Sequence, residues 1–222
     1  MTSRHDAPGA SAGLGTYDRL ADAWLDCIDL ILRRGQEVHD DGVPLKELLN
    51  VSFSAQTCDP AELIAAGASA GRLNLMIEKY ASPAILPMYR MSYGKLFREH
   101  AGVDQVDWLV QRLKLRPEAK SATIGFHLPG DDVLSCISLV DCKLRSGRLY
   151  LTGVFRSQNA FASQPGNAVA LSRIQHEIAA ALDVAPGPLT LHVMSAHIYQ
   201  EDWAAAGRLV SARRRSRVRN DG

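Results

Sequence analysis

The chain has 222 residues, of which 46% are hydrophobic and 22% are charged, as in ordinary globular proteins. This length suffices for one large domain with a sizeable core, or for two small domains. The formal net charge is only +1 at pH 7, which excludes a global field that recruits nucleic acid or membrane.

The sequence shows no export or membrane signal. No run approaches the roughly 18 apolar residues that span a bilayer, and the start, MTSRHDAPGASAG, lacks the apolar core of a signal peptide. We therefore expect a cytoplasmic protein with reduced thiols, and the scattered histidines predict no zinc site. The cysteines, none in a C-x-x-C pair, are Cys27, Cys58, Cys136 and Cys142.

The N-terminal half predicts mainly helices. Residues 1–15 are rich in Gly, Ala, Ser and Pro, which indicates disorder. From Tyr17 to Arg34, apolar residues recur at three- and four-residue steps, which is typical of an amphipathic helix. A strand is expected near Leu48–Phe53. Residues 59–80 predict a helix with a glycine break, because a capping aspartate precedes a proline that suits the first turn.

The C-terminal half predicts mainly strands after one more helix, Val106–Leu115. With no repeat or obvious linker, we expect one α+β domain over residues 16–207, between the disordered residues 1–15 and a basic tail over 208–222. A second helix is expected at Asn167–Leu182. The strands are expected at Ala122–Phe126, Val133–Leu144, Arg148–Phe155 and Leu189–Met194, with a hairpin turn at Ser146-Gly147.

The last residues, SARRRSRVRNDG, contain five arginines. A solvated, partly frayed end explains them, and so does a tail that binds nucleic acid or phosphate. The sequence leaves both open.

The segment RSQNAFASQPGN at Arg156–Asn167 joins a predicted strand to a predicted helix. It holds one arginine, four amide side chains and two serines. Such a loop can simply turn the chain, or it can bind a small polar ligand. Cys136 in VLSCISLVDCKL is equally open, since a cysteine in a strand is more often a small buried hydrophobe than a nucleophile.

The spacing of these residues resembles that of the thymidylate synthase family, including its pyrimidine hydroxymethylases. Cys136 precedes Arg156-Ser157 by twenty residues, Asn167 follows Arg156 by eleven, and H-x-Y at His197–Tyr199 follows Asn167 by thirty. The family has a strand cysteine, an R-S-x-D…P-x-N loop and an H-x-Y strand end in this order. YGKLFR, from Tyr93, is similar to the family's Y-G-x-x-W-R.

The resemblance implies a single α+β domain, with a mixed sheet flanked by helices and one sheet face used in a homodimer. It also implies methylenetetrahydrofolate as the one-carbon donor for a pyrimidine nucleoside monophosphate. The Cys136 thiolate would add to C6 so that C5 becomes nucleophilic. Arg156 would favour the thiolate and bind the phosphate, with help from Ser157. Tyr93 would belong to the network that removes the C5 proton.

The resemblance further implies roles for the other matching residues. An amide at Asn167 goes with uracil in the family, whereas a carboxylate goes with cytosine, so a uridine-type base is favoured. The same asparagine would also fit as a cap of the helix 167–182. His197 and Tyr199 would bind the 3′-hydroxyl.

Several positions depart from the family pattern. Asn159 stands in place of the aspartate that meets the pterin, and Asp141 in place of a glutamine, so folate binding is expected to be altered. Lys120-Ser121 replaces an arginine pair that reaches the partner's phosphate site. The phosphate loop corresponds to residues 39–43, without arginine.

Two further points stay open. The catalytic glutamate of the family could correspond to Glu62 or Glu78. The short C-terminus resembles that of short archaeal-type synthases and favours a hydroxymethyl product over a methyl product. A family member with altered catalysis that only binds nucleotide is the alternative function.

Overall fold

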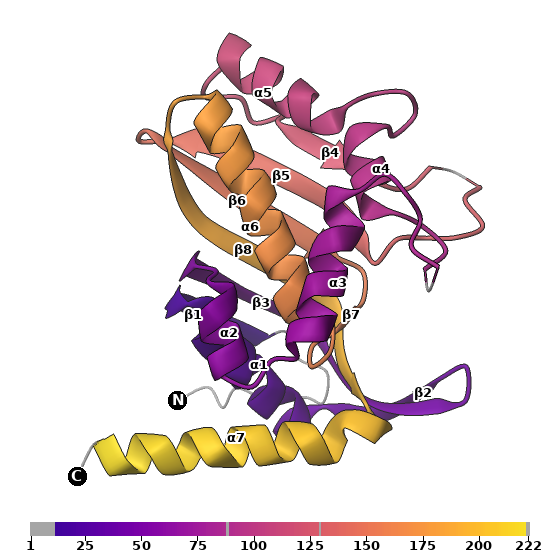
Figure 1. Ribbon diagram of the computed structural model, residues 1–222, viewed down its shortest axis with the longest axis vertical. Helices are drawn as coiled ribbons and strands as arrows, with labels where there is room; N and C mark the ends of the chain where they lie inside the picture. The colour runs from indigo at the N-terminus through magenta and orange to yellow at the C-terminus, as the bar shows by residue number, and fades with distance from the viewer. Residues whose placement is uncertain (1–11, 88, 129, 221–222) are drawn as a thin grey trace, which may run out of the picture.

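The computed structural model describes residues 12–87, 89–128 and 130–220, with side chains described up to residue 215. Its centre is a mixed sheet with strand order β1-β3-β8-β6-β5-β4, to which β2 adds beside β3 and β7 beside β8 (Figure 1). The expected α+β fold with a mixed sheet and flanking helices is confirmed. The strands are β1 Ala12–Arg19, β2 Gln36–Asp40, β3 Val43–Thr57, β4 Thr123–Gly125, β5 Ile137–Arg145, β6 Arg148–Phe155, β7 Gln158–Asn159 and β8 Ala185–Tyr199.

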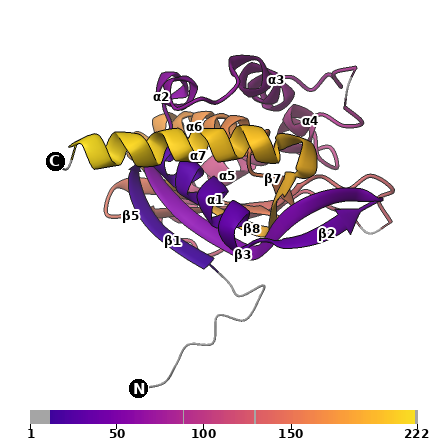
Figure 2. The same cartoon turned by 90° about the horizontal axis from the view of Figure 1, so that it is seen from below.

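The helices gather on one side of the sheet, as Figure 2 shows. Apolar side chains of α1 and α6 are buried against β3, β6 and β8, and they form the core. On the uncovered face, Tyr150 and Met194 are exposed. The helices are α1 Leu20–Arg34, α2 Pro60–Ala65, α3 Ala70–Ala81, α4 Tyr93–Arg98, α5 Gln105–Leu115, α6 Gln164–Ala181 and α7 Gln200–Asn220. No helix in the described ranges is long and apolar enough to cross a membrane.

Local sequence signals account for several elements. Asp59 accepts a hydrogen bond from the backbone N–H of Ala61 at 2.8 Å and so caps α2. The expected hairpin turn between β5 and β6 has φ values of 50° at Ser146 and 69° at Gly147. Positive φ at both central residues is typical of a type I′ turn, whose twist matches that of the two strands.

The N-terminal prediction is wrong in part. Residues 12–15, expected to be disordered, and Tyr17, expected to be helical, belong to β1, and α1 begins only at Leu20. Here β1 pairs in parallel with β3, with Tyr17 opposite Ala55. This pairing with a distant segment overrides the local helical periodicity. Residues 1–11 of the expected disordered segment lie outside the described residues.

The junction between β7 and α6 also differs from the prediction. Helix α6 begins at Gln164, so Asn167 lies within its first turn and does not cap it. Pro165 fits here because the first turn of a helix does not need its N–H. A Cβ on Gly166 would come within 2.4 Å of Met76 Cβ. This glycine therefore allows α6 to pack closely against α3.

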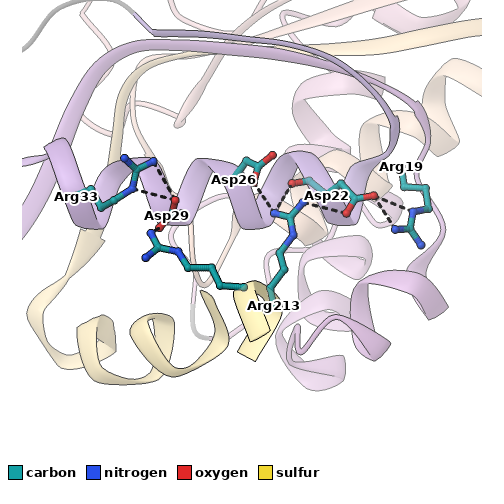
Figure 3. Close-up of polar contacts among 7 residues, drawn as sticks. Arg19, Asp22, Asp26, Asp29, Arg33 and Arg213 are labelled. Atoms are coloured by element: carbon teal, nitrogen blue, oxygen red, sulfur yellow. Dashed lines mark hydrogen bonds and ion pairs between the residues drawn. The ribbon is translucent and has the colours of Figure 1, made fainter. Parts of the chain in front are cut away.

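The arginine-rich C-terminus is helical and packs on α1 (Figure 3). The Arg213 guanidinium lies 3.0 Å from a carboxylate oxygen of Asp22 and 2.6 Å from one of Asp26. Only 12% of this arginine side chain is exposed. The expectation of a solvated end does not hold for Arg213, whereas Arg214 and Arg215 are exposed as expected. The expected boundary at residue 208 falls inside α7.

Candidate active site

Cys136 lies half-buried immediately before β5, not inside the strand as predicted, since β5 begins at Ile137. Its backbone is held from two sides. The N–H of Cys136 donates to the hydroxyl of Tyr93 at 3.2 Å, and the N–H of Arg156 donates to the carbonyl of Cys136 at 2.8 Å. The sequence prediction thus brought together three residues that do lie side by side.

Tyr93 begins α4 and is 3% exposed. Burial raises the pKa of its phenol, and the charge of Cys136 and a hydrogen bond to its side chain add to this. The phenol therefore keeps its proton at neutral pH and acts as a hydrogen-bond donor toward Cys136. A Cβ on Gly94 would come within 2.4 Å of the Ser82 carbonyl oxygen, so this glycine allows α4 to start against the end of α3.

Arg156 follows β6, and its side chain returns to the segment before Cys136. Its Nε donates to the carbonyl of Ser135 at 3.0 Å, and its Nη2 donates to the carbonyl of Leu134 at 3.1 Å. No ion pair with a carboxylate is found for it within the described ranges. Since a guanidinium has five N–H donors, three remain for a ligand. Ser157, the next residue, is half-buried.

Asn167 is 3% exposed and connects to Cys136 through two tyrosines. The Tyr80 hydroxyl donates to Asn167 Oδ1 at 3.1 Å, and the rings of Tyr80 and Tyr93 meet edge to face at 4.9 Å. Burial raises the pKa of Tyr80 well above its usual value. Tyr80 therefore donates a proton, which assigns the Asn167 oxygen to the tyrosine side and leaves the NH₂ group to donate elsewhere.

His197 and Tyr199 end β8 beside the Asn159 loop. Asn159 on β7 pairs with His197, and the His197 carbonyl accepts from Ala160 N–H at 2.8 Å. Burial lowers the pKa of His197, so the imidazole is neutral at pH 7. The pKa of Tyr199 is raised mainly by burial, then by Asp40, and to a lesser extent by Cys136.

The side chain of Asn159 is used within its own loop. Its Oδ1 accepts from the N–H groups of Phe161 at 3.1 Å and Ala162 at 2.9 Å. Because both lone pairs of the amide oxygen are engaged, only the NH₂ group remains for a ligand. The loop is also anchored to α1, since the Trp24 indole donates to the Ala160 carbonyl at 2.8 Å.

Two predicted site residues lie away from this group in the same subunit. Asp141 accepts from the Thr123 hydroxyl at 2.5 Å and forms an ion pair with Lys143. It is five residues along β5 from Cys136, a distance of about 16 Å at the usual rise of a strand. Lys120 is exposed in the turn before β4.

The structure also locates the residues that were expected to correspond to the phosphate loop and to the catalytic glutamate. Residues 39–43 comprise the end of β2, the turn at Asp41-Gly42 and the start of β3, and Asp40 accepts from the Tyr199 hydroxyl at 3.3 Å. Glu78 is exposed on α3. Glu62 lines a groove with Arg19 and Arg213, between α1, α2 and α7. Among the described residues, neither glutamate forms a hydrogen bond with Cys136 or Tyr93, and neither prediction gains support.

Sequence reasoning missed Lys79, which lies beside Tyr93. It is 8% exposed, and its Nζ lies 3.9 Å from the ring centre of Tyr93 and 4.1 Å from that of Tyr89. One signal was available. The lysine stands between Ile77 and Tyr80 on a helix whose apolar residues face the core, a position where a charge is unusual.

Comparison with known proteins identifies the family. The family model described as "Thymidylate synthase" matches residues 78–219, which include Cys136 and the other expected site residues apart from Glu62 and residues 39–43. A protein of Methanothermobacter thermautotrophicus named "Putative thymidylate synthase" is 30% identical over 87% of this chain and 96% of its own. One of Methanothermobacter marburgensis with the same name is 30% identical over 88% and 96%, and one of Methanosarcina barkeri is 28% identical over 83% and 88%. The chain therefore belongs to the thymidylate synthase family, and at the level of that family it is a one-carbon transferase acting at C5 of a pyrimidine.

Proposed function

We propose that the chain transfers a one-carbon unit to C5 of a pyrimidine nucleoside 5′-monophosphate, with a uridine-type base. The observation that carries this proposal is the continuous set of contacts from Cys136 through Tyr93 and Tyr80 to Asn167. It joins a candidate nucleophile to a candidate base-recognition group. Arg156, which has no carboxylate partner among the described residues, lies at the nucleophile end.

In the proposed mechanism, the thiolate of Cys136 adds to C6 of the base, and the resulting enolate makes C5 nucleophilic. Methylenetetrahydrofolate would supply the carbon. Tyr93 donates a hydrogen bond toward the reacting cysteine and belongs to the group of residues that handles the C5 proton. After the C5 proton has left, the bond from the transferred carbon to tetrahydrofolate would break, water would add to that carbon to give the hydroxymethyl group, and loss of the thiolate from C6 would free Cys136 for another turnover.

Asn167 supports a uridine-type base because of how Tyr80 holds it. With Oδ1 fixed toward Tyr80, the NH₂ group can donate to the base O4. The second lone pair of Oδ1 can accept from N3–H. Cytosine has an amino group at position 4 and no proton on N3. Its amino group would face the NH₂ group of Asn167, and its N3 would face Oδ1, so neither hydrogen bond could form.

The remaining roles follow the same arrangement. Arg156 and Ser157 bind the phosphate, while His197 and Tyr199 bind the sugar hydroxyl. Lys120, distant from Cys136 in its own subunit, contacts the phosphate of a partner subunit in a homodimer that forms through the uncovered sheet face. We place the reaction in the cytoplasm, in keeping with cysteines that are all free thiols.

The folate side of the site fits only in part. Asn159 would offer an amide donor in place of the usual carboxylate acceptor, because its carbonyl oxygen is engaged by the loop. Asp141, tied to Thr123 and Lys143, would contact the cofactor only from a different subunit or after rearrangement. This departure favours a product other than a simple methyl group, and we propose hydroxymethylation ahead of methylation.

The test is release of tritium from C5 of labelled nucleotides into water, with uridine and cytidine 5′-monophosphates in ribo and deoxy forms. Wild-type protein with methylenetetrahydrofolate should release tritium from one uridine nucleotide, and Cys136→Ala should release none. The matched control is Cys142→Ala, which removes a fully buried thiol from the adjoining strand and should keep the activity. Equal release by wild type and Cys136→Ala would refute the mechanism, and mass spectrometry of the product separates methyl from hydroxymethyl.

A binding protein without catalysis is the second candidate, favoured by the engaged oxygen of Asn159. Calorimetry distinguishes the two candidates. Nucleotide binding without tritium release, at any combination of nucleotide and folate, would establish the second candidate in place of the first.

A further inference from the structure

Lys79 is a buried cation without an acidic partner. It belongs to the last turn of α3, and 8% of the residue is exposed. Across residues 12–87, 89–128 and 130–220, no carboxylate forms an ion pair with it. Its Nζ lies instead between the rings of Tyr89 and Tyr93, at 4.1 and 3.9 Å from their centres.

Such a position is costly for a charge. Buried charges in proteins are normally paired with an opposite charge, because removal from water disfavours the charged form. Burial lowers the pKa of Lys79 accordingly. The two aromatic rings offset only part of this cost, since a cation over a ring is a weak substitute for hydration. The helix C-terminus attracts a cation as well, but the ammonium points to the rings and not to exposed solvent.

The anion that can face Lys79 is the thiolate of Cys136. A thiolate there would raise the pKa of Lys79 against the effect of burial. Tyr93 lies between the two residues, because its ring centre is 3.9 Å from Nζ and its hydroxyl accepts the backbone N–H of Cys136 at 3.2 Å. The other ionisable groups that interact with Cys136 or Tyr93 are Tyr80 and Tyr199, which are neutral, and Arg156, a second cation.

The two cations differ in their remaining contacts. Arg156 is exposed, holds two backbone carbonyls and keeps donors free for a ligand. Lys79 is 8% exposed, and its Nζ lies between two aromatic rings. Arg156 is therefore open to a ligand from solvent, whereas Lys79 is buried beside the tyrosine that contacts the backbone of Cys136.

We propose that Lys79 is the positioning cation that keeps Cys136 in its anionic, nucleophilic form, so that Arg156 is left to bind the phosphate. This inference deepens the proposed function and rests on it for the role of Cys136. It assigns the activation of the thiol to a residue of α3, outside the loop and strand motifs that define the site in the sequence.

The test measures alkylation of Cys136 by iodoacetamide between pH 5 and 10, with the modified Cys136 peptide quantified by mass spectrometry. The readout is the pH at which the alkylation rate is half-maximal, because the rate itself also reflects intrinsic nucleophilicity. Lys79→Met should move this midpoint upward by about one pH unit or more, as expected for loss of a neighbouring opposite charge. Lys79→Arg should restore it. The matched control is Lys95→Met, an exposed lysine on α4, which should leave the midpoint unchanged.

An unchanged midpoint in Lys79→Met would overturn the inference. Lys79→Gln, which keeps a polar end, replaces the methionine variant if that variant does not fold. Alkylation of Cys136 needs neither nucleotide nor folate, so this measurement can succeed or fail separately from the tritium-release assay that tests the proposed function. A shifted midpoint without tritium release by wild type would support the role of Lys79 and remove the proposed reaction. Tritium release by wild type together with an unshifted midpoint in Lys79→Met would support the proposed reaction and remove the role of Lys79.

Discussion

Charges are arranged differently in two regions of the molecule, the contact between α1 and α7 and the surroundings of Cys136. Along the contact between α1 and α7, cations meet carboxylates (Figure 3). Arg213 bridges Asp22 and Asp26, and Arg214 pairs with Asp29. Around Cys136, by contrast, the cations Lys79 and Arg156 meet aromatic rings and backbone carbonyls.

This difference distinguishes charged residues that stabilise the fold from charged residues that can act on a substrate or a nucleophile. A paired cation has its field neutralised nearby and contributes mainly to stability. A cation that lacks an acidic partner retains its field for a thiolate or a phosphate. If this distinction is correct, substitutions in the two regions should affect different measurements.

The largest expected effect is at the site. Arg156→Ala should lower kcat/KM for tritium release by about 100-fold, because charge-assisted hydrogen bonds to a phosphate contribute about 1.5–3 kcal/mol each. The melting temperature should change little. Arg148→Ala, an exposed arginine at the other end of β6, is the control. A loss of the same size in that control would mean that Arg156 has no special role.

A smaller effect is expected at the contact of α1 with α7, and it should appear in stability alone. Arg213→Ala removes two ion pairs from a side chain that is 12% exposed, and we expect a loss of about 2 kcal/mol, below the full cost of a completely buried pair. For a domain of this size the melting temperature should fall by about 4–8 °C. Arg214→Ala, whose side chain is 59% exposed, should cost less than about 0.5 kcal/mol.

Thermal unfolding followed by circular dichroism measures both variants, and kcat/KM should stay at the wild-type value in both. Equal melting temperatures for the two variants would contradict the assignment of the stabilising contact to Arg213. A loss of activity in Arg213→Ala, without a change in melting temperature, would contradict the division between the two regions.

The smallest expected effect is on base recognition. Tyr80→Phe removes the hydroxyl that donates to Asn167 Oδ1, a hydrogen bond worth about 1 kcal/mol. Binding of the uridine nucleotide should weaken about fivefold. Discrimination against the cytidine nucleotide should also fall, because the side-chain amide of Asn167 can then rotate and exchange the positions of its oxygen and nitrogen. Calorimetry with both nucleotides checks this, and unaltered discrimination would show that Tyr80 does not orient the amide.

Local patterns were enough to predict much of the fold. Amphipathic spacing predicted the core of α1, the expected helix Val106–Leu115 corresponds to α5, and the Ser146-Gly147 pair predicted the hairpin. The site prediction came from the separations between Cys136, Arg156 and Asn167. These residues lie at ends of neighbouring elements, so fixed separations along the chain bring them to the same edge of the sheet.

The failures share a physical cause, which is dependence on distant partners. Strand β1 is stabilised by pairing with β3, and the C-terminal helix by aspartates of α1 about 190 residues earlier. Neither partner is visible in the local sequence. The ion pair of Asp141 with Lys143 was equally invisible, because a motif match does not say which ion pair a strand residue has already formed. Lys79 was overlooked since its ring partners come from other segments.

Strand β8 ends at Tyr199 and α7 begins at Gln200, so no linker separates them. Without a flexible linker, a displacement or rotation of α7 is passed directly to the end of β8. A force applied to the C-terminus by a fusion partner or a surface attachment would therefore be transmitted along α7 to His197 and Tyr199 at the end of β8. Immobilisation through the opposite terminus would avoid that strain.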